Sequence, residues 1–285
     1  MNTNLPAIVI TGASTGIGEA CALELDRRGF RVFAGVRSEA AGAALRAKAS
    51  PWLTPIQLDV TEAASIAAAA ELVGKAVRET GLTGLVNNAG IAVPGPLEAV
   101  PIDALRRQFE VNVIGVVAVT QAFLPLIRKA RGRLVNISSV NGSLSMPYMG
   151  AYSASKFALE ALSDALRTEL CPWKIHVALV EPGPIDTPIW NKSMTLADQL
   201  VAQADPQVLS FYEKEIAGLR RTVDGIVGKA SPVDRVVQAV VHALTAERPK
   251  IRYFLGFPIR FLFKGFHMAP DRLRDRIARR LMGLS

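Results

Sequence analysis

Cysteine, histidine and aromatic residues are scarce in this chain. Its 285 residues include two cysteines and three histidines, and aromatic side chains make up 6%. Cys21 and Cys171 lie far apart and no histidine stands at metal-ligand spacing, which excludes a disulfide framework and a Cys/His metal centre. We therefore expect two reduced thiols, with Cys21 packed in a helix, and no bound metal.

Long hydrophobic runs and export segments are also missing. The uncharged, mostly apolar span Val111–Ile127 contains Asn112 and Pro125 and only reaches the lower length limit for a membrane helix. We expect it to be a helix packed against a sheet or a second subunit. The first twelve residues have no basic segment before their short apolar stretch, which predicts no signal peptide and a cytoplasmic protein.

Positive charge is concentrated at the C-terminal end. The chain has a net charge of +8, and residues 260–285 contain seven Lys or Arg against two Asp. Nucleic-acid-binding proteins more often spread basic residues along a stripe interleaved with aromatics, so we expect no nucleic-acid partner. A basic amphipathic tail beside the five phenylalanines of residues 254–266 predicts either a weak peripheral membrane contact or a subunit contact.

Short β-branched runs alternate with longer segments of helical periodicity. Half of the residues are hydrophobic and one fifth are charged, which suits a chain with a large core. The strand-like runs are 7–10, 31–36, 56–58, 84–86, 133–137 and 175–180, and the helix-like segments are 18–28, 39–49, 63–80, 103–130 and 152–170. This alternation predicts an α/β fold with a doubly wound, mostly parallel sheet and helices on both faces. We expect one domain over residues 1–250, then helical pieces ending near Thr245 and a hydrophobic, basic appendage over 251–285.

A glycine-rich turn is the first chemical signal. The sequence TGASTGIG, Thr11–Gly18, follows the first expected strand and opens a helix. Glycines allow a tight turn and a close approach of the backbone to a pyrophosphate, and a helix N-terminus offers free N–H groups. Such a turn alone is often only a turn, but its place between strand and helix favours a dinucleotide site.

Further motifs follow in a fixed order. They are LDV at Leu58–Val60, NNAG at Asn87–Gly90, YSASK at Tyr152–Lys156 and EPGPIDTP at Glu181–Pro188. With the TGxxxGxG turn, they resemble the short-chain dehydrogenase/reductase family through Pro188. Residues 81–90, 181–190 and 231–256 resemble its branch of retinol and 17-beta-hydroxysteroid dehydrogenases. The resemblance implies a Rossmann fold, an NAD(P)-dependent oxidoreductase, and a homodimer or homotetramer formed through the helices at 103–130 and 152–170.

The resemblance also implies a catalytic tetrad and a set of cofactor contacts. The tetrad consists of Asn112, Ser139, Tyr152 and Lys156, with Ser138 as the competing serine. The expected cofactor contacts are Gly12, Ser14, Thr15, Gly16, Ile17, Gly18, Arg37, Asp59, Val60, Asn88, Ala89, Gly90, Tyr152, Lys156, Pro182, Gly183, Ile185 and Thr187. In the family, Ser139 orients the substrate oxygen and Asn112 supports a proton relay to the lysine.

The chemistry of Tyr152 and Lys156 also follows from their residue types. They stand four apart, so on a helix they share one face. An ammonium beside a phenol favours the phenolate, so we expect the pKa of Tyr152 to fall below its usual ~10 and to suit a general acid/base. Taken singly, each tetrad residue is more typical of a surface or capping position; taken together and in order, they favour catalysis.

Cofactor choice depends on the end of the second strand. An Asp or Glu there would hold the ribose hydroxyl of NAD, whereas the sequence has Arg37, which can pair with a 2′-phosphate. Ser14, Thr15 and Ser38 add hydroxyl donors. This predicts NADP, with NAD as the alternative if Glu39 takes the ribose instead.

Apolar residues surround the expected site. The loop Leu144–Met149 precedes Tyr152, and Ile189, Trp190 and Met194 follow the PG motif. They favour a bulky apolar alcohol or ketone, with ordinary packing as the alternative. Two other classes stay open: a catalytically silent NADP(H)-binding sensor or scaffold, and a peripheral membrane protein governed by its tail.

Overall fold

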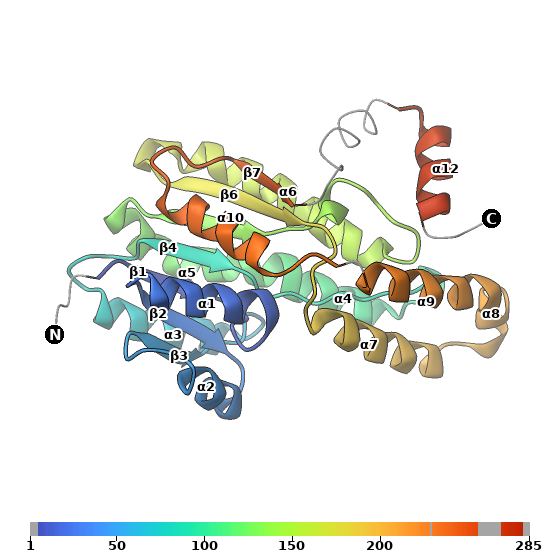
Figure 1. Cartoon of the computed structure of the whole chain (residues 1–285), viewed down its shortest axis with the longest axis horizontal. Coiled ribbons are helices and arrows are strands. Elements are labelled where there is room, and N and C mark those ends of the chain that lie inside the picture. The colour runs from blue at the N-terminus through green and yellow to red at the C-terminus, as the bar shows by residue number, and fades with distance from the viewer. Residues whose placement is uncertain (1–4, 229, 256–268, 282–285) are drawn as a thin grey trace.

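One parallel sheet with helices on both faces forms the body of the molecule (Figure 1). The computed structural model describes residues 5–228, 230–255 and 269–281. Its strands are β1 (Ala7–Ile10), β2 (Arg31–Val36), β3 (Leu53–Gln57), β4 (Gly84–Asn87), β5 (Arg133–Ile137), β6 (His176–Pro182) and β7 (Arg252–Leu255). Its helices are α1 (Gly16–Arg27), α2 (Glu39–Arg46), α3 (Ala63–Ala76), α4 (Ile102–Phe109), α5 (Gly115–Ala130), α6 (Gly150–Glu169), α7 (Ile189–Gln203), α8 (Pro206–Ser210), α9 (Glu213–Val227), α10 (Asp234–Thr245) and α12 (Asp271–Leu281). Short turns of other helix types are η1 (Glu110–Ile114), η2 (Val140–Gly142) and η3 (Cys171–Trp173).

The strand order confirms the doubly wound fold. The strands run β3-β2-β1-β4-β5-β6-β7, and every neighbouring pair is parallel. The chain winds outward in one direction from β1 and in the other from β4. In such sheets the ligand crevice lies at the carboxyl ends of the strands where the winding reverses, which here is the β1–β4 edge.

The core lies in two layers, one on each face of the sheet. Ile8 and Ile10 of β1 face α1 and α10, while Ala7 and Val9 face α3 and α5. This follows from the two-residue period of a strand, because successive side chains point to opposite faces. Both faces are covered, which explains why the strands are apolar runs instead of alternating patterns.

Helix α4, the π-helical turn η1 and α5 form one continuous segment, Ile102–Ala130. Among the described residues it is the segment long and apolar enough to cross a membrane by length and composition. Val119, Phe123 and Ile127 are buried in the core against the sheet. This confirms the expected packing of Val111–Ile127 on the sheet, and we interpret the segment as a core helix.

Several boundaries differ from the sequence-based expectation. β3 begins at Leu53 and includes Pro55, which a strand at the sheet edge tolerates because one side of it needs no ladder hydrogen bond. β7 pairs with β6 and extends the sheet to Leu255, past the expected start of the appendage at residue 251. The basic tail contains the helix α12, whereas most of the phenylalanine-rich stretch lies outside the described residues.

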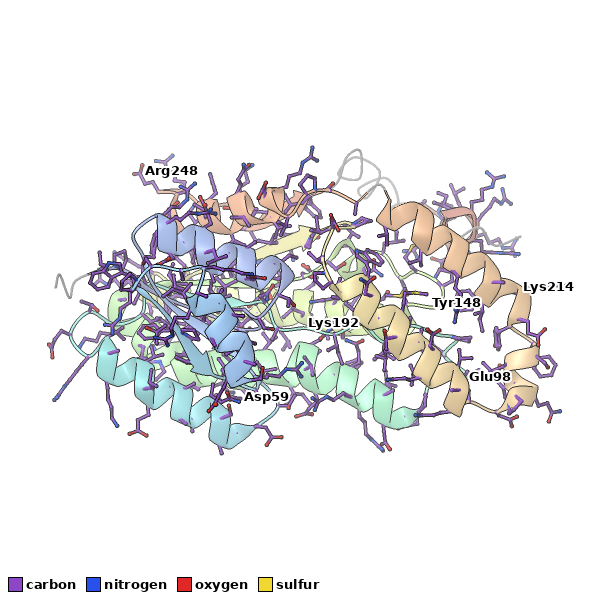
Figure 2. The ribbon with its side chains drawn as sticks, turned by 60° about the horizontal axis from the view of Figure 1, so that its bottom comes forward. Asp59, Glu98, Tyr148, Lys192, Lys214 and Arg248 are labelled. Carbon is purple, nitrogen blue, oxygen red and sulfur yellow. The ribbon has the colours of Figure 1, made fainter. Side chains whose placement is uncertain are left out.

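A lobe of three helices, α7 to α9, extends beyond the carboxyl edge of the sheet (Figure 1). The Tyr212 hydroxyl at the α8–α9 junction donates to Glu98 Oε2 at 2.6 Å. The Tyr212 ring packs edge-on against Tyr148, with 6.4 Å between ring centroids. Tyr148 has a φ of 62°, which is rare outside glycine. The loop before Tyr152 is therefore joined to the lobe by a defined contact; Figure 2 labels Tyr148 and Glu98.

Candidate active site

The expected site residues gather at the carboxyl edge of the sheet. Thr11, at the end of β1, accepts hydrogen bonds on its hydroxyl from the backbone N–H groups of Asn88 and Ala89, each 3.0 Å long. The Asn88 amide donates to the carbonyls of Thr11 and Gly12, also at 3.0 Å. The NNAG motif thus holds the glycine turn in place, and β1 and β4 present their motifs side by side.

The glycine turn fits the backbone approach that a pyrophosphate needs. Gly12 and Gly16 have φ of +66° and +63°, which glycine adopts without strain. A Cβ on Gly18 would lie 2.3 Å from the Gly12 carbonyl oxygen and 2.4 Å from the Asn88 amide nitrogen. Thr15 is the N-cap residue of α1. Its side chain accepts no hydrogen bond from the first N–H groups of the helix.

The ends of β2 and β3 lie at one side of this turn. Arg37 is exposed at the end of β2, Ser38 caps α2, and Glu39 is already in the first turn of α2. Burial works to raise the pKa of Asp59, but hydrogen bonds from Thr61 and the charge of Arg37 hold it below its usual value. Arg37 thus has an open side, and Asp59 is an ionised carboxylate beside it.

Asn112 lies in the π-helical turn η1 and is fully buried. Its amide nitrogen donates to the Ile91 carbonyl at 3.0 Å and to the Ser155 hydroxyl at 3.1 Å, and its oxygen accepts from the Ile91 N–H at 2.9 Å. Both amide hydrogens are therefore used within the protein. Any part that Asn112 plays in a proton relay falls to its backbone, while its side chain fixes the loop after NNAG to helix α6.

Ser139, and not Ser138, faces the tyrosine. The Ser139 hydroxyl hydrogen-bonds to Tyr152, and it also caps η2 by accepting from Asn141 N–H at 3.1 Å. Ser138 lies on the other side of the loop, where a Cβ on Gly142 would meet both the Ser138 hydroxyl and the Glu160 side chain. The loop therefore directs one serine to the site and one to a buried carboxyl.

Tyr152 and Lys156 share one face of α6, as their spacing predicts. The Lys156 ammonium lies 5.8 Å from the centre of the Tyr152 ring and donates to the Ile137 carbonyl at 2.8 Å. Burial lowers the pKa of Lys156 to about 8, against the opposing charge of Glu160. A lysine with a pKa this close to neutral is typical of functional sites.

The expected direction of the tyrosine shift is corrected by the structure. Burial raises the pKa of Tyr152, and the hydrogen bond with Ser139 only partly opposes this. Lys156 does not lower it here because the ammonium is itself desolvated and is directed to the Ile137 carbonyl. In this arrangement Tyr152 is a neutral phenol, which suits it to donate a proton.

The PG motif closes the site from β6. A Cβ on Gly16 would lie 3.3 Å from the Thr187 side chain, so the motif after Pro182 and Gly183 packs on the glycine turn. Ile185 forms an isolated bridge with Ser231 and accepts a hydrogen bond from the Trp190 indole at 2.8 Å. Together these contacts anchor α7 above the turn.

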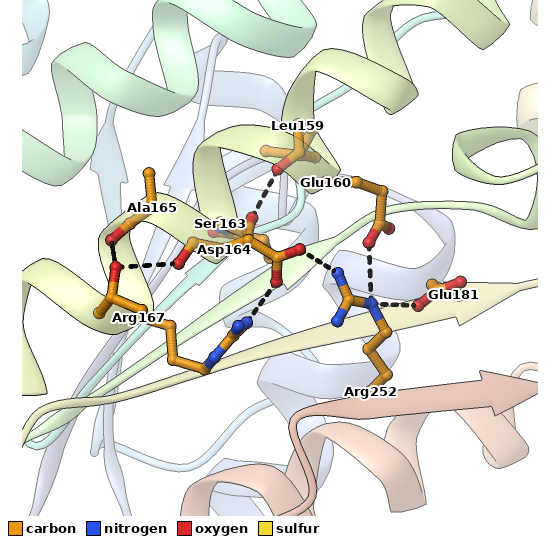
Figure 3. A network of polar contacts seen from close by, with 10 residues as sticks. Leu159, Glu160, Ser163, Asp164, Ala165, Arg167, Glu181 and Arg252 are labelled. Atoms are coloured by element: carbon orange, nitrogen blue, oxygen red, sulfur yellow. Dashed lines mark hydrogen bonds and ion pairs between the residues drawn. The ribbon is translucent and has the colours of Figure 1, made fainter.

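Sequence reasoning missed Lys192, which is four residues past Pro188 on α7. Its ammonium donates to the Thr15 hydroxyl at 3.1 Å, and Figure 2 labels this lysine on α7. No motif spacing marks this lysine, because the contact spans most of the chain. The sequence also gave no role to Glu160, Glu181 and Arg252, which form the buried network in Figure 3.

The comparison with known families identifies the family to which this chain belongs. Residues 6–197 match the family model described as short chain dehydrogenase. The chain belongs to the short-chain dehydrogenase family. As a short-chain dehydrogenase it is an oxidoreductase that interconverts an alcohol and a carbonyl group.

Relatives support the same branch that the motifs indicate. Retinol dehydrogenase 16 of Homo sapiens is 38% identical over 279 residues, covering 95% of this chain and 86% of the relative. The 17-beta-hydroxysteroid dehydrogenase type 6 of Bos taurus is 38% identical and covers 96% and 87%. An NADPH-dependent 3-dehydrocapnine reductase of Ornithobacterium rhinotracheale is 37% identical and covers 94% of both chains. All three are dehydrogenases or reductases, which gives no support to a catalytically silent protein.

A solved short-chain dehydrogenase has the same fold. The enzyme of Burkholderia cenocepacia J2315, in complex with NADP, has a TM-score of 0.73 and 27% sequence identity. The match covers 97% of this chain and 98% of that one. The likeness therefore includes the lobe and the sheet together.

Proposed function

We propose that this short-chain dehydrogenase uses NADP, with NAD as the alternative, to interconvert a bulky apolar alcohol and its carbonyl compound. The single observation that carries the proposal is the pairing of the Ser139–Tyr152–Lys156 group with the glycine turn at one edge of the sheet. The retinol and hydroxysteroid dehydrogenases among its relatives act, by their names, on apolar alcohols.

Three groups of residues would hold the dinucleotide. Gly12, Gly16 and Gly18 let the backbone approach the pyrophosphate, and the α1 N-terminus offers N–H groups and a positive dipole end. Arg37 supplies a cation for a 2′-phosphate, which a guanidinium can bind through two hydrogen bonds. Asp59, Val60, Ala89, Gly90, Pro182, Gly183, Ile185 and Thr187 are proposed to line the rest of the site.

The bound dinucleotide supplies or accepts the hydride. Tyr152 donates its phenolic proton to the carbonyl oxygen during reduction and takes a proton from the alcohol during oxidation. The Ser139 hydroxyl bonds the same oxygen and stabilises the charge that develops on it. The Lys156 ammonium stabilises the phenolate that remains after proton donation and, by family resemblance, holds the cofactor ribose.

Apolar side chains support the proposed class of substrate. Leu144, Met146 and Met149 precede Tyr152, and α7 carries Ile189 and Met194. Flexible methionine side chains adapt to irregular apolar shapes. None of these side chains is charged, whereas a polar carbonyl acid would need a charged residue to bind it.

The test is NADPH oxidation against a panel of apolar carbonyl compounds, including retinal-like aldehydes and steroid ketones, with Tyr152→Phe as the control. We expect turnover by the wild type and a loss of about 10²–10⁴-fold in kcat for the variant, because general acid catalysis contributes that much. Equal inertness of both proteins, while NADPH still binds, would favour a sensor or scaffold instead.

Three further properties stay predictions. They are a cytoplasmic location, a homodimer or homotetramer, and a weak peripheral contact of the basic tail with anionic membranes. The tail helix α12 supports the last of these, since it carries five arginines and two aspartates over Asp271–Leu281.

A further inference from the structure

Lys192 connects the lobe to the glycine turn and has no part in the mechanism above. It lies in the first turn of α7, and its ammonium donates to the Thr15 hydroxyl at 3.1 Å. The two residues are 177 positions apart in the sequence, and both are exposed. Because Thr15 directly precedes α1, the contact holds a cation beside the turn that would receive the dinucleotide.

No carboxylate of the described residues pairs with this ammonium. Glu19, in the first turn of α1, is bound by Lys48 at 2.7 Å instead. Asp198, on α7 itself, is paired with an arginine of α9. The exposed Asp186 of the PG motif makes no ion pair within the part of the chain that the structure describes. Lys192 is therefore a cation at the glycine turn without an anion of its own.

The groups around this contact are hydrogen-bond donors that have no protein acceptor. A lysine ammonium carries three hydrogens, and one of them is donated to Thr15. Over the described ranges, the other two are donated to no protein group, and neither are the hydroxyl hydrogens of Ser14 and Thr15. A cation and several free donors at one turn suit an anionic ligand with several oxygens.

Helix dipoles favour the same kind of ligand. Lys192 lies near the N-terminal ends of both α1 and α7, and the N-terminal end of a helix carries partial positive charge. A cation is unfavourable at such an end, whereas an anion is stabilised there. The position of Lys192 therefore makes electrostatic sense once an anion lies between it and α1.

Helix α7 depends on few contacts with the body of the molecule. None of its residues is buried. Two side chains of its first turn reach outside the helix: the Trp190 indole donates to the Ile185 carbonyl at 2.8 Å, and Lys192 donates to Thr15. A ligand bound by Lys192 at the turn would add a third contact and hold α7 more firmly.

A purely structural role for Lys192 is the alternative. An exposed hydrogen bond from an ammonium to a neutral hydroxyl adds little to stability, because water offers both groups similar partners. A phosphate oxygen is a stronger acceptor for the same ammonium, because both partners of that bond are charged. The contact with Thr15 is thus better suited to hold Lys192 at the turn than to hold the fold together.

We propose that Lys192 is a cofactor-binding residue whose ammonium binds the pyrophosphate of the dinucleotide and so links the lobe to it. The inference rests on the proposed function, since it assumes that a dinucleotide occupies the glycine turn. The pyrophosphate is common to NADP and NAD. Lys192 therefore contributes to the binding of both, whereas Arg37 distinguishes between them.

The first test is fluorescence titration of the full chain with NADPH and with NADH. Lys192→Met keeps the length of the side chain and removes its charge. We expect it to raise the Kd of both nucleotides by the same factor, roughly 5–30-fold, between the effect of an exposed ion pair and that of a charge-assisted hydrogen bond. Lys192→Arg should keep most of the affinity, because it keeps the charge.

Lys214→Met is the matched control. Lys214 is an exposed lysine of α9, and Figure 2 shows it at the far end of the lobe from Lys192. This change removes the same charge from the lobe and should leave both Kd values in place. Added salt should raise the Kd of NADH more steeply for the wild type than for Lys192→Met, because only the wild type has this pair to screen.

Hydrogen exchange in α7 separates direct binding from a structural role, because it is measured at saturating NADPH. We expect NADPH to slow amide exchange in α7 of the wild type by a larger factor than in α7 of Lys192→Met. If NADPH slows exchange by the same factor in both proteins, Lys192 does not link the lobe to the cofactor and the proposal is overturned.

The titrations have two further outcomes that contradict the proposal. Unchanged Kd values in Lys192→Met would show that the ammonium does not bind the cofactor. A loss of affinity confined to NADPH would place the ammonium at the 2′-phosphate instead of the pyrophosphate. If the wild type binds neither nucleotide, the proposed function itself fails, and that result is distinct from a variant that binds as well as the wild type.

Discussion

At the scale of single residues, Arg37 governs the choice between the two dinucleotides. It is exposed at the end of β2, and its carbonyl is held by the Gln57 amide at 2.8 Å. Glu39, the residue that would favour NAD, is held in the first turn of α2. The exposed Arg37 guanidinium therefore directly follows β2, at the strand end where the ribose is expected.

Replacing Arg37 by glutamate is expected to reverse the preference. Loss of a charge-assisted pair is worth about 1.5–3 kcal/mol, which corresponds to a roughly 10- to 150-fold rise in the Kd of NADPH. NADH, which has no 2′-phosphate, should bind with nearly unchanged affinity. Fluorescence titration of both nucleotides measures this, and an equal loss for both would show that Arg37 acts only on the fold.

Residue spacing predicted which side chains meet, but not their ionisation. The four-residue spacing of Tyr152 and Lys156 and the thirteen-residue spacing of Ser139 from Tyr152 identified side chains that are together in the structure. The upward shift of the Tyr152 pKa depends on burial by segments distant in the sequence, which spacing does not describe. The same limit hid Glu181, whose partner Arg252 lies on another strand.

At the scale of elements, the turn between β1 and α1 depends on the absence of one side chain. Gly18 lies inside α1 against the Gly12 carbonyl and the Asn88 amide, and both of those groups belong to the hydrogen-bonded pairing of β1 with β4. A side chain here must displace backbone, which a packed core resists.

We expect Gly18→Ala to destabilise the protein by about 1–3 kcal/mol, the usual cost of overpacking, and to weaken NADPH binding. Gly225→Ala is the matched control, because nothing lies within 4 Å of a Cβ at Gly225 of α9. That change should stabilise by about 0.5–1 kcal/mol through helix propensity. Urea unfolding with and without NADPH measures both, and equal stability of the two variants would refute the packing argument.

Strongly periodic elements were predicted with nearly correct bounds, whereas weakly marked ones were not. β1, β2 and β5 begin and end as expected from their apolar runs. β7 is a four-residue strand that begins with a charged residue, and Arg252 is there because it neutralises buried carboxyl groups from other elements. Such a strand is recognisable only once its neighbours are known.

At the scale of the whole molecule, exposed apolar side chains remain on η1 and α6, which belong to the segments proposed to form a subunit contact. Ile114, at the end of η1, is 52% exposed, and Phe157 of α6 is 41% exposed. α6 packs against η1, so the two residues lie on neighbouring elements. Exposed apolar patches of this kind are typical of subunit interfaces.

The double variant Ile114→Glu/Phe157→Glu is expected to dissociate the homodimer or homotetramer, because charge at the centre of an apolar interface is costly. Light scattering coupled to gel filtration gives the mass directly. Phe211→Glu, a change at a 69% exposed position on the lobe, is the control and should keep the assembly. A wild-type monomer, or a double variant of unchanged mass, would refute this assembly.

The whole account depends on direct hydride transfer at the Tyr152 site, and isotope transfer measures it most directly. NADPH carrying deuterium at both positions of C4 is mixed with an apolar ketone, and the alcohol product is analysed by mass spectrometry. We predict deuterium on the carbinol carbon with the wild type and almost none with Tyr152→Phe, although the variant binds NADPH equally well. Alcohol without deuterium, or equal transfer by both proteins, would contradict the account.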